Sequence, residues 1–360
     1  MKPLAGVRVL EFDGLGPVTF AGMLLADWGA EVLRVTRSAD AAPAAFGEVG
    51  GALLHRGRTA APADLKSAED RDRVLALAER ADIVIEGFRP GVLERLGLGP
   101  EALHGRNPRL VIGRVTGWGQ DGPLSQQVGH DLNYIALSGA LHAMGDADRP
   151  PPPPLNLVGD YGGGAMLLAA GVLAALTEAR TTGRGRVVDA AMTDGAALLS
   201  GLFQALRAQG LWSDARGANL LDGGAPFYRC YACRDGRFVA VGALEPRFYA
   251  ALLAGLEIDP AEAPQHDRAA WPATARRFAA RFATRDRDDW CARFADGEAC
   301  VTPVLALAET PDHPHNRARG VFVGDLPQPA PLFDGVRPAP GAAGAAGLDE
   351  ALARWRDADG

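Results

Sequence analysis

Lysine and cysteine are scarce in this chain of 360 residues. Only Lys2 and Lys66 are lysines among its 37 basic residues, a bias from which no mechanism follows. The four cysteines are too few and too dispersed for a disulfide framework in a chain of this length. Positive charge is not in excess either, because the net charge is −7 and the isoelectric point is about 5.6. The sequence therefore gives no electrostatic reason to expect nucleic acid as a partner, and a ligand that carries phosphate would need a local basic pocket.

Long hydrophobic runs are also missing. The best candidate, 162–178, has 17 residues with four glycines, and it predicts a buried core helix rather than a membrane span. The N-terminus lacks the features of a signal peptide, and the C-terminal residues 357–360 are not a peroxisomal signal. We therefore expect a cytoplasmic protein with no membrane partner.

Metal-binding patterns are weak. Cys230 and Cys233 have the spacing of a metal or redox motif, but they lie in an alternating stretch, 227–241, that predicts a β-hairpin. Side chains three residues apart on a strand point to opposite faces, so the two thiols are poorly placed to hold one ion. His313 and His315 flank a proline and have no third ligand nearby. Neither pattern favours a metal site, although neither excludes one.

The opening of the chain predicts the start of a doubly wound α/β sheet. A strand, a glycine-rich turn, a helix and a second strand follow one another at 7–12, 14–17, 20–28 and 31–35. The dinucleotide-binding pattern is incomplete, because Thr19 stands where the third glycine belongs and the second strand ends at Arg37 rather than in a carboxylate. The turn therefore indicates a phosphorylated ligand more than it indicates NAD.

The alternation of expected helices and strands continues to about residue 219, where the sequence pattern changes. We expect helices at 69–80, 162–178 and 196–209 and strands at 82–86, 110–115 and 187–190. The hairpin and the charge-rich helical stretch 246–294 are typical of a second, smaller domain. A stretch rich in Pro and Ala, 326–346, predicts a tether, and 348–355 predicts a terminal helix that docks elsewhere.

The expected fold class is thus α/β, with a Rossmann-like large domain and a smaller α+β domain. We place the large domain at 1–195, completed by 325–360, a linker helix at 196–218 and the small domain at 219–324.

Residues that could carry chemistry concentrate in two segments, Gly129–Tyr134 and Leu155–Gly164. Asp160 comes just before an expected helix whose first turn has three glycines, so backbone N–H groups there are open to a ligand. A simple N-cap aspartate, which stabilises a helix by about 1 kcal/mol, explains the same position. His130 taken alone is likewise more often a hydrogen-bonded core histidine than a catalyst. Position alone therefore favours the N-cap and the core histidine over catalytic roles.

The order of these segments resembles the family III coenzyme A (CoA) transferases and, within them, the α-methylacyl-CoA racemases. Both branches keep an aspartate at the position of Asp160, and the racemases are distinguished by a histidine at His130 and by Glu-Pro at Glu245 and Pro246. The chain departs from the common pattern at His55, where asparagine is usual. Further matching motifs extend along the chain, at Gly14–Pro17, Ala63–Lys66, Ile85–Gly91, Thr116–Gln120 and Asp222–Tyr228.

The resemblance implies an enzyme that interconverts the R and S forms of 2-methylacyl-CoA thioesters by proton transfer through an enolate. Elementary chemistry requires two acid/base groups on opposite faces of the α-carbon. A histidine such as His130 titrates near neutrality. A carboxyl group such as Asp160 must be buried to hold a proton, because a helix N-terminus by itself favours the ionised form. By resemblance, the backbone N–H of Asp131 holds the enolate oxygen, and Glu245 of a second subunit orients His130.

The resemblance also implies an interlocked homodimer in which CoA binds the large domain as part of the substrate, with no separate cofactor. Arg37 and Arg89 suit the phosphates and the adenine of CoA. The other residues expected to line the CoA site are Ala63, Asp64, Leu65, Lys66, Gly87, Phe88, Arg95, Gly129, His130, Asp131, Leu132, Asn133 and Tyr134.

Three other functions stay open. In a CoA transferase, Asp160 would be the nucleophile that takes the acyl group as a mixed anhydride. An NADP-binding oxidoreductase is suggested by Gly14, Gly16 and Arg37. The third alternative is a non-catalytic protein that binds acyl-CoA.

Overall fold

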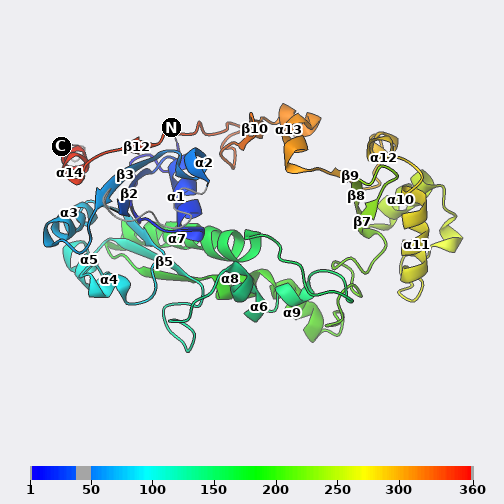
Figure 1. The fold of residues 1–360 in the computed structure, drawn as a ribbon, viewed down its shortest axis with the longest axis horizontal. Helices are drawn as coiled ribbons and strands as arrows, with labels where there is room; N and C mark the ends of the chain where they lie inside the picture. Colours follow the sequence, from blue (N-terminus) through cyan, green and yellow to red (C-terminus); the bar gives the residue numbers. More distant parts are fainter. Residues whose placement is uncertain (1, 38–49, 358–360) are drawn as a thin grey trace. The chain divides into compact units, whose positions relative to one another are not determined.

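The structure, a computed structural model, describes residues 2–37 and 50–357 (Figure 1). Residues 358–360, on which part of the localisation argument rests, lie outside that range. The chain divides into two compact units. The large unit comprises Met1–Ala140, Pro153–Gly201 and Leu326–Gly360, and the small unit comprises Leu141–Pro152 and Leu202–Asp325. By its contacts the segment Leu141–Pro152 belongs to the small unit, a feature that the sequence does not indicate.

A seven-stranded parallel sheet forms the centre of the large unit, in the order β12-β3-β2-β1-β4-β5-β6. The α/β class is therefore confirmed, and the blue and cyan strands of Figure 1 belong to this sheet. Chain order reverses between β1 and β4, and ligands of doubly wound sheets bind at the carboxyl ends of the strands at such a point. The strands are β1 (Arg8–Phe12), β2 (Glu31–Arg37), β3 (Arg58–Ala63), β4 (Ile83–Glu86), β5 (Val111–Thr116), β6 (Val187–Ala191) and β12 (Gly344–Ala345).

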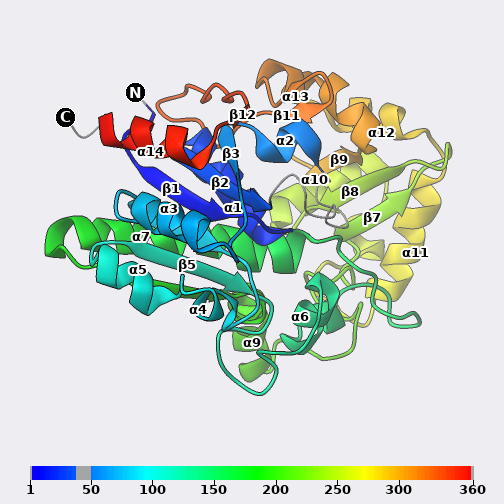
Figure 2. The ribbon, with the colours of Figure 1, turned by 60° about the vertical axis from the view of Figure 1, so that its left-hand side comes forward.

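Helices cover both faces of this sheet, which is why all residues of β4 and β5 are buried. On one face, α1 and α7 pack Leu25 and Val172 into a core with the strands. On the other face, α3 and α14 pack Leu77 and Trp355, and the red helix α14 lies beside α3 (Figure 2). The expected terminal helix is confirmed. The helices of this unit are α1 (Pro17–Asp27), α2 (Gly51–His55), α3 (Ala68–Ala78), α4 (Val92–Arg95), α5 (Pro100–Arg106), α6 (Asp131–Leu137), η2 (Leu157–Met166), α7 (Leu167–Thr182), α8 (Met192–Leu199) and α14 (Leu348–Asp357).

The segment Leu157–Thr182 is long and apolar enough to cross a membrane by length and composition alone. Half of its most apolar window is buried inside the structure. Leu168, Val172 and Leu176 belong to the core beside the sheet. These contacts are those of a core helix, as the glycine-rich sequence predicts.

The expected tether, 326–346, runs along the N-terminal part of the large unit. The indole N–H of Trp28 donates to the carbonyl oxygen of Ala330 at 2.8 Å. The backbone N–H of Gly57 donates to the carbonyl oxygen of Gly341 at 2.9 Å. The segment then adds β12 to the edge of the sheet, beside β3. Neither β3 nor β12 is apparent from the sequence, because β3 contains a proline and β12 has only two residues.

The small unit has a three-stranded antiparallel sheet, β7-β8-β9, so the predicted hairpin is confirmed. Cys230 in β7 is exposed, and Cys233, the residue after β7, is buried. Aromatic residues dominate the core, among them Phe278 and Trp290. The elements are η1 (Leu141–Ala143), α9 (Gly201–Ala208), β7 (Tyr228–Ala232), β8 (Phe238–Gly242), α10 (Pro246–Leu256), η3 (Pro260–Glu262), α11 (Trp271–Phe282), α12 (Arg287–Phe294), β9 (Val301–Val304), η4 (Leu307–Asp312), α13 (Pro314–Ala318) and the short β10 (Phe322–Val323). The short strand β11 (Leu326–Pro327) belongs to the large unit.

The prediction of one helix over 196–209 is wrong. The structure has α8 and α9, with a break at Ser200, directly before Gly201. The hydroxyl of Ser200 donates to the carbonyl oxygen of Ala196 at 2.9 Å. A Ser-Gly pair of this kind favours a kink or a break in a helix.

Candidate active site

A cavity of about 610 Å³ opens at the carboxyl ends of β1, β4 and β5, at the point where strand order reverses. The turn after β1 contributes Gly16, and the segment after β4 contributes Gly87 to Pro90. The end of β5 and the following turn contribute Val115 to Trp118. His130 and Asp160 also line this cavity, although they come from separate segments of the chain. The structure thus brings together the two residues on which the sequence argument depends.

His130 stands at the N-cap of the short helix α6 and is exposed to the cavity. Its backbone N–H donates to Oδ1 of Asn133 at 3.0 Å. One turn later, the buried Tyr134 donates its hydroxyl to the carbonyl oxygen of Gly129 and packs edge-on against Trp118, with ring centroids 4.8 Å apart. These contacts fix the backbone on both sides of His130. The histidine is therefore not the buried core residue that the sequence leaves open.

Asp160 lies inside a π-helical segment, η2, rather than before a helix. The N-cap interpretation is wrong, because the helical segment begins at Leu157 and Asp160 is its fourth residue. The backbone N–H of Asp160 donates to Oδ1 of Asp131 at 2.6 Å, and the side-chain amide of Asn156 donates to Oδ2 of Asp160 at 3.3 Å. π-Helical turns are rare and occur frequently at functional sites.

The glycines after Asp160 serve close packing. A Cβ at Gly163 would lie 2.8 Å from the backbone nitrogen of Ala196, and a Cβ at Gly195 would lie 2.0 Å from the carbonyl oxygen of Gly163. Only glycine allows η2 and α8 to approach so closely. The expectation that this turn leaves its backbone open to a ligand is thus wrong at Gly163, whose neighbour is another helix.

The surroundings of Asp160 favour its protonated form. Burial raises the pKa of its carboxyl group above the ordinary value. The hydrogen bond from Asn156 lowers this pKa, the negative charge of Asp131 raises it, and the charge of His130 lowers it. The net direction is upward, which is what a carboxyl group needs to act as an acid as well as a base.

Two arginines line the cavity and supply the basic surface that a phosphate ligand would need. Arg37 is the last residue of β2, and Arg89 follows β4. Among the residues that the structure describes, no cluster of three or more His, Cys, Asp or Glu has the arrangement of a metal site. The cavity thus combines two acid/base groups with a cationic rim.

Comparison with known proteins places this arrangement in a family. The sequence model of the family described as CoA-transferase family III matches residues 4–339. The chain belongs to family III of the CoA-transferases. It is 45% identical over 345 residues to the alpha-methylacyl-CoA racemase of Mus musculus, a match that covers 94% of this chain and 88% of that protein. The alpha-methylacyl-CoA racemase of Homo sapiens is 43% identical over 336 residues, with 92% and 86% covered.

The fold agrees with that of a solved family member. A CaiB/BaiF family protein from Brucella suis superposes with a TM-score of 0.80, and the match covers 99% of each chain. Sequence identity to that protein is 23%, so this likeness concerns the fold alone.

The residues expected to bind CoA in this family III chain fall into two groups. Seven line the cavity: Arg37, Gly87, Phe88, Arg89, Gly129, His130 and Tyr134. Eight others do not line it: Ala63, Asp64, Leu65, Lys66, Arg95, Asp131, Leu132 and Asn133. Ala63 is the buried last residue of β3, and Oδ1 of Asp64 accepts the backbone N–H of Lys66 at 3.0 Å. CoA binding stays a prediction for the residues of both groups.

Sequence reasoning did not name Trp118 or Met192 among the expected site residues, although both line the cavity. Trp118 lies in a motif that the family shares, so that motif could have indicated it. Met192 begins α8 and is isolated in the sequence, and only the packing of α8 against η2 brings it to the cavity.

Glu245 lies in the small unit, at the N-cap position of α10. Its side chain is exposed and makes no capping hydrogen bond to the helix. Its negative charge contributes to raising the pKa of Cys300. The carboxylate of Glu245 therefore does not serve as the cap of α10.

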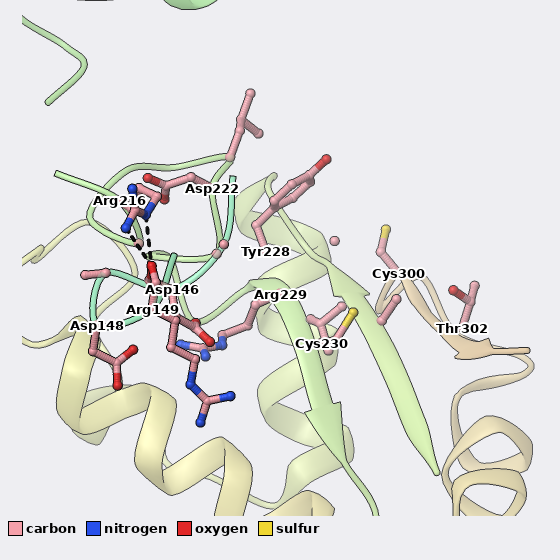
Figure 3. A pocket seen from close by; sticks show the side chains of 18 residues that line it. Asp146, Asp148, Arg149, Arg216, Asp222, Tyr228, Arg229, Cys230, Cys300 and Thr302 are labelled. Carbon is pink, nitrogen blue, oxygen red and sulfur yellow. Dashed lines mark hydrogen bonds between the residues drawn. The ribbon is translucent and has the colours of Figure 1, made fainter. Parts of the chain in front are cut away.

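A second cavity, of about 1040 Å³, lies within the small unit (Figure 3). The guanidinium group of Arg216 donates to the carbonyl oxygens of Arg149 at 2.7 Å and Asp146 at 3.2 Å, as the dashed lines of Figure 3 show. The cavity wall also contains Asp222 and Arg229, so charges of both signs are present. None of the site residues predicted from the sequence lines it, and its mixed charge favours neither an anion nor a cation.

Proposed function

We propose that this chain is an isomerase that interconverts (R)- and (S)-2-methylacyl-CoA thioesters by proton transfer at the α-carbon. The observation that carries the proposal is the presence of His130 and Asp160 in one cavity, on separate structural elements. Inversion needs two acid/base groups, and the raised pKa of Asp160 suits a group that must both give and take a proton. The racemase names of the relatives from Mus musculus and Homo sapiens support the same reaction.

The proposed steps conserve every atom. One group takes the α-proton, and the C–H electron pair moves into the thioester to form an enolate. The backbone N–H of Asp131 stabilises the enolate oxygen, because the first N–H groups of a helix have no acceptor within it. The second group then returns a proton to the opposite face, which restores the carbonyl group. No electrons are gained or lost, so the step itself requires no redox cofactor.

The CoA part of the substrate is proposed to lie along the cationic rim. Arg37 and Arg89 offer planar guanidinium groups that bind phosphate oxygens and stack on adenine. These contacts persist unchanged during proton transfer, so they anchor the substrate without lowering the barrier.

We also propose that the active protein is an interlocked homodimer and that Glu245 of a partner chain orients His130. The carboxylate of Glu245 is exposed and does not cap α10. It is therefore free to accept a hydrogen bond, which supports this role. The division of the chain into two units, with the segment 141–152 assigned to the small unit, is compatible with such an exchange.

The decisive experiment is incubation of one pure enantiomer of a 2-methylacyl-CoA with the protein in D₂O. We expect deuterium at the α-carbon and loss of optical purity, without any added cofactor, as seen by mass spectrometry and chiral chromatography. The rival function is CoA transfer with Asp160 as the nucleophile. Transfer of CoA to an added carboxylic acid without α-exchange would establish that rival.

A further inference from the structure

The side chain of Asp131 occupies an unusual position for a carboxylate. Asp131 is only 8% exposed, although it is the first residue of a helix, where an aspartate ordinarily faces water. Its Oδ1 accepts the backbone N–H of Asp160 at 2.6 Å. Its Oδ2 is buried and has no hydrogen-bond partner among the residues that the structure describes. The sequence and the family resemblance assign a role to the backbone of Asp131 and none to this carboxylate.

The enclosure of this carboxylate is tight. A Cβ at Gly159 would lie 2.5 Å from Oδ1 of Asp131 and 3.1 Å from Ile135. Asp131 is not among the residues that line the cavity, so no direct contact of its carboxylate with the substrate is assigned. Burial of a carboxylate with one oxygen unpaired costs free energy. An aspartate that served only the dipole of α6 would not need this burial.

Asp131 joins the two residues to which the proposed function assigns proton transfer. It follows His130 directly in the chain, and it holds the backbone of Asp160 through the hydrogen bond to Oδ1. The relative position of the imidazole and the carboxyl group thus depends on this one side chain. Misplacement by about 1 Å can slow an enzyme by on the order of 10²-fold.

We propose that the carboxylate of Asp131 is a positioning residue for the reaction, which clamps Asp160 against the start of α6 and holds a negative charge beside the Asp160 carboxyl group. This inference deepens the proposed function and rests on it. The clamp fixes the spacing between the two acid/base groups. The charge makes the Asp160 carboxyl group hold its proton to higher pH.

The electrostatic role proposed for Asp131 follows from the groups that face Asp160. These are Asn156, His130, Tyr134 and Asp131. Asn156 and His130 favour the ionised carboxylate, and a helix N-terminus does the same. Among these side chains, Asp131 is the one whose charge acts together with burial to raise the pKa of Asp160. Without that charge, Asp160 would give up its proton at lower pH.

The test uses Asp131→Asn, which keeps the shape of the side chain and an oxygen acceptor for the Asp160 N–H but removes the charge. The protein is labelled with [γ-¹³C]aspartate, and the Asp160 signal is assigned by its absence in Asp160→Asn. We expect the titration midpoint of Asp160 to move to lower pH in Asp131→Asn. Asp189→Asn is the matched control, because Oδ2 of Asp189 also accepts a backbone N–H, that of Gln120 at 2.8 Å, and Asp189 does not line the cavity. That variant should leave the midpoint in place.

A midpoint that is unchanged in Asp131→Asn, or one that moves equally in Asp189→Asn, overturns the proposal. Asp131→Ser removes the charge and retains an oxygen acceptor, and it provides the same test if Asp131→Asn does not fold. Because this titration needs no turnover, its result is independent of whether the wild-type protein racemises or transfers CoA. The D₂O assay on the wild type decides that question separately.

Kinetics then test the clamp. Asp131→Ala removes both the hydrogen bond and the charge, and we expect it to reduce racemisation by on the order of 10²-fold at saturating substrate. Asp131→Asn should retain more activity and show its pH profile displaced to lower pH. A purely structural role would lower the amount of folded protein in both variants without displacing the profile, and that result would contradict the proposal.

Discussion

The left-handed backbone of Gly16 lies directly against the carboxylate of Asp160. Gly16 has φ +64°, and a Cβ at this position would lie 2.9 Å from Oδ2 of Asp160. The glycine-rich turn after β1 therefore meets the π-helical segment at the residue proposed to move a proton. Glycine is required here both by the backbone conformation and by the close approach of Asp160.

Replacement of Gly16 should accordingly affect the reaction more than stability. Gly16→Ala places a methyl group against the carboxylate, so we expect kcat to fall and the free energy of unfolding to decrease by about 1 to 2 kcal/mol. Gly6→Ala is the matched control, because Gly6 has φ +82° and open space around the added Cβ. Urea denaturation and the racemisation assay compare the two variants. Equal kcat values would show that the contact with Asp160 is irrelevant to activity.

The two proposed acid/base groups can be separated by the enantiomer on which each acts. If each residue faces one side of the α-carbon, His130→Ala should abolish α-proton exchange from one enantiomer and Asp160→Asn from the other. Neither variant should racemise, because reprotonation must come from the missing side. Exchange in D₂O is measured separately on the R and S thioesters.

The control for this pair is His104→Ala, since His104 bonds to the carbonyl oxygen of Leu110 at 2.9 Å and does not line the cavity. It should exchange both enantiomers as the wild type does. Equal loss of exchange from both enantiomers in both active-site variants would contradict the facial assignment and favour a covalent role for Asp160.

The arginines of the cationic rim, Arg37 and Arg89, should affect substrate binding rather than the chemical step. We expect Arg37→Ala and Arg89→Ala each to raise KM by about tenfold with little change in kcat, the size expected for one charge-assisted hydrogen bond. Arg106→Ala is a suitable control, because Arg106 pairs with Glu79 at 2.8 Å and does not line this cavity. A loss confined to kcat would place these arginines at the reacting atoms instead.

The proposed exchange between subunits predicts complementation. Asp160→Ala and Glu245→Ala should each be inactive alone. Refolded as a mixture, they should recover part of the activity, because one site of a mixed dimer would contain both native residues. The recovery is measured as racemisation per mixed dimer after separation on two affinity tags. Inactive mixed dimers of normal size would contradict a shared site.

The small unit should lose one stabilising interaction in acid. Both guanidinium nitrogens of Arg287 bond to Glu309, at 2.7 and 2.9 Å, and this pairing lowers the pKa of Glu309 to about 2. A carboxyl group with a lowered pKa in the folded state contributes stability above its ordinary value of 4.5 and loses it as the pH falls toward about 2. Glu309→Gln should therefore be less stable than the wild type at pH 7, and the difference should shrink between about pH 4.5 and pH 2.

Denaturation with urea at several pH values measures this difference. Glu262→Gln is the control, because the exposed pair of Glu262 and Arg277 is separated by 3.7 Å and should contribute little at any pH. A difference between Glu309→Gln and the wild type that stays constant down to pH 2 would show that the ion pair is not its cause.

The sequence by itself determined the parts of this protein that depend on local periodicity and on short motifs. The hydrophobic strands at β1, β2, β4 and β5, with the glycine turn between them, predict the parallel sheet correctly, because buried parallel strands read as continuous apolar runs. The hairpin of the small unit and the terminal helix α14 follow from alternation and from helical spacing. The same motifs named His130 and Asp160 as candidates, and the family comparison agrees with the resemblance they carry.

Tertiary structure decided what surrounds those candidates. The sequence places Asp160 before a helix as a cap, whereas contact of Gly163 with α8 and the bond to Asp131 hold it inside a π-helical segment. Asp131 and Asp160 are 29 residues apart, so no local pattern can indicate that one carboxylate holds the backbone of the other. Burial and neighbouring charge set the pKa of Asp160, and both arise only when distant segments pack together.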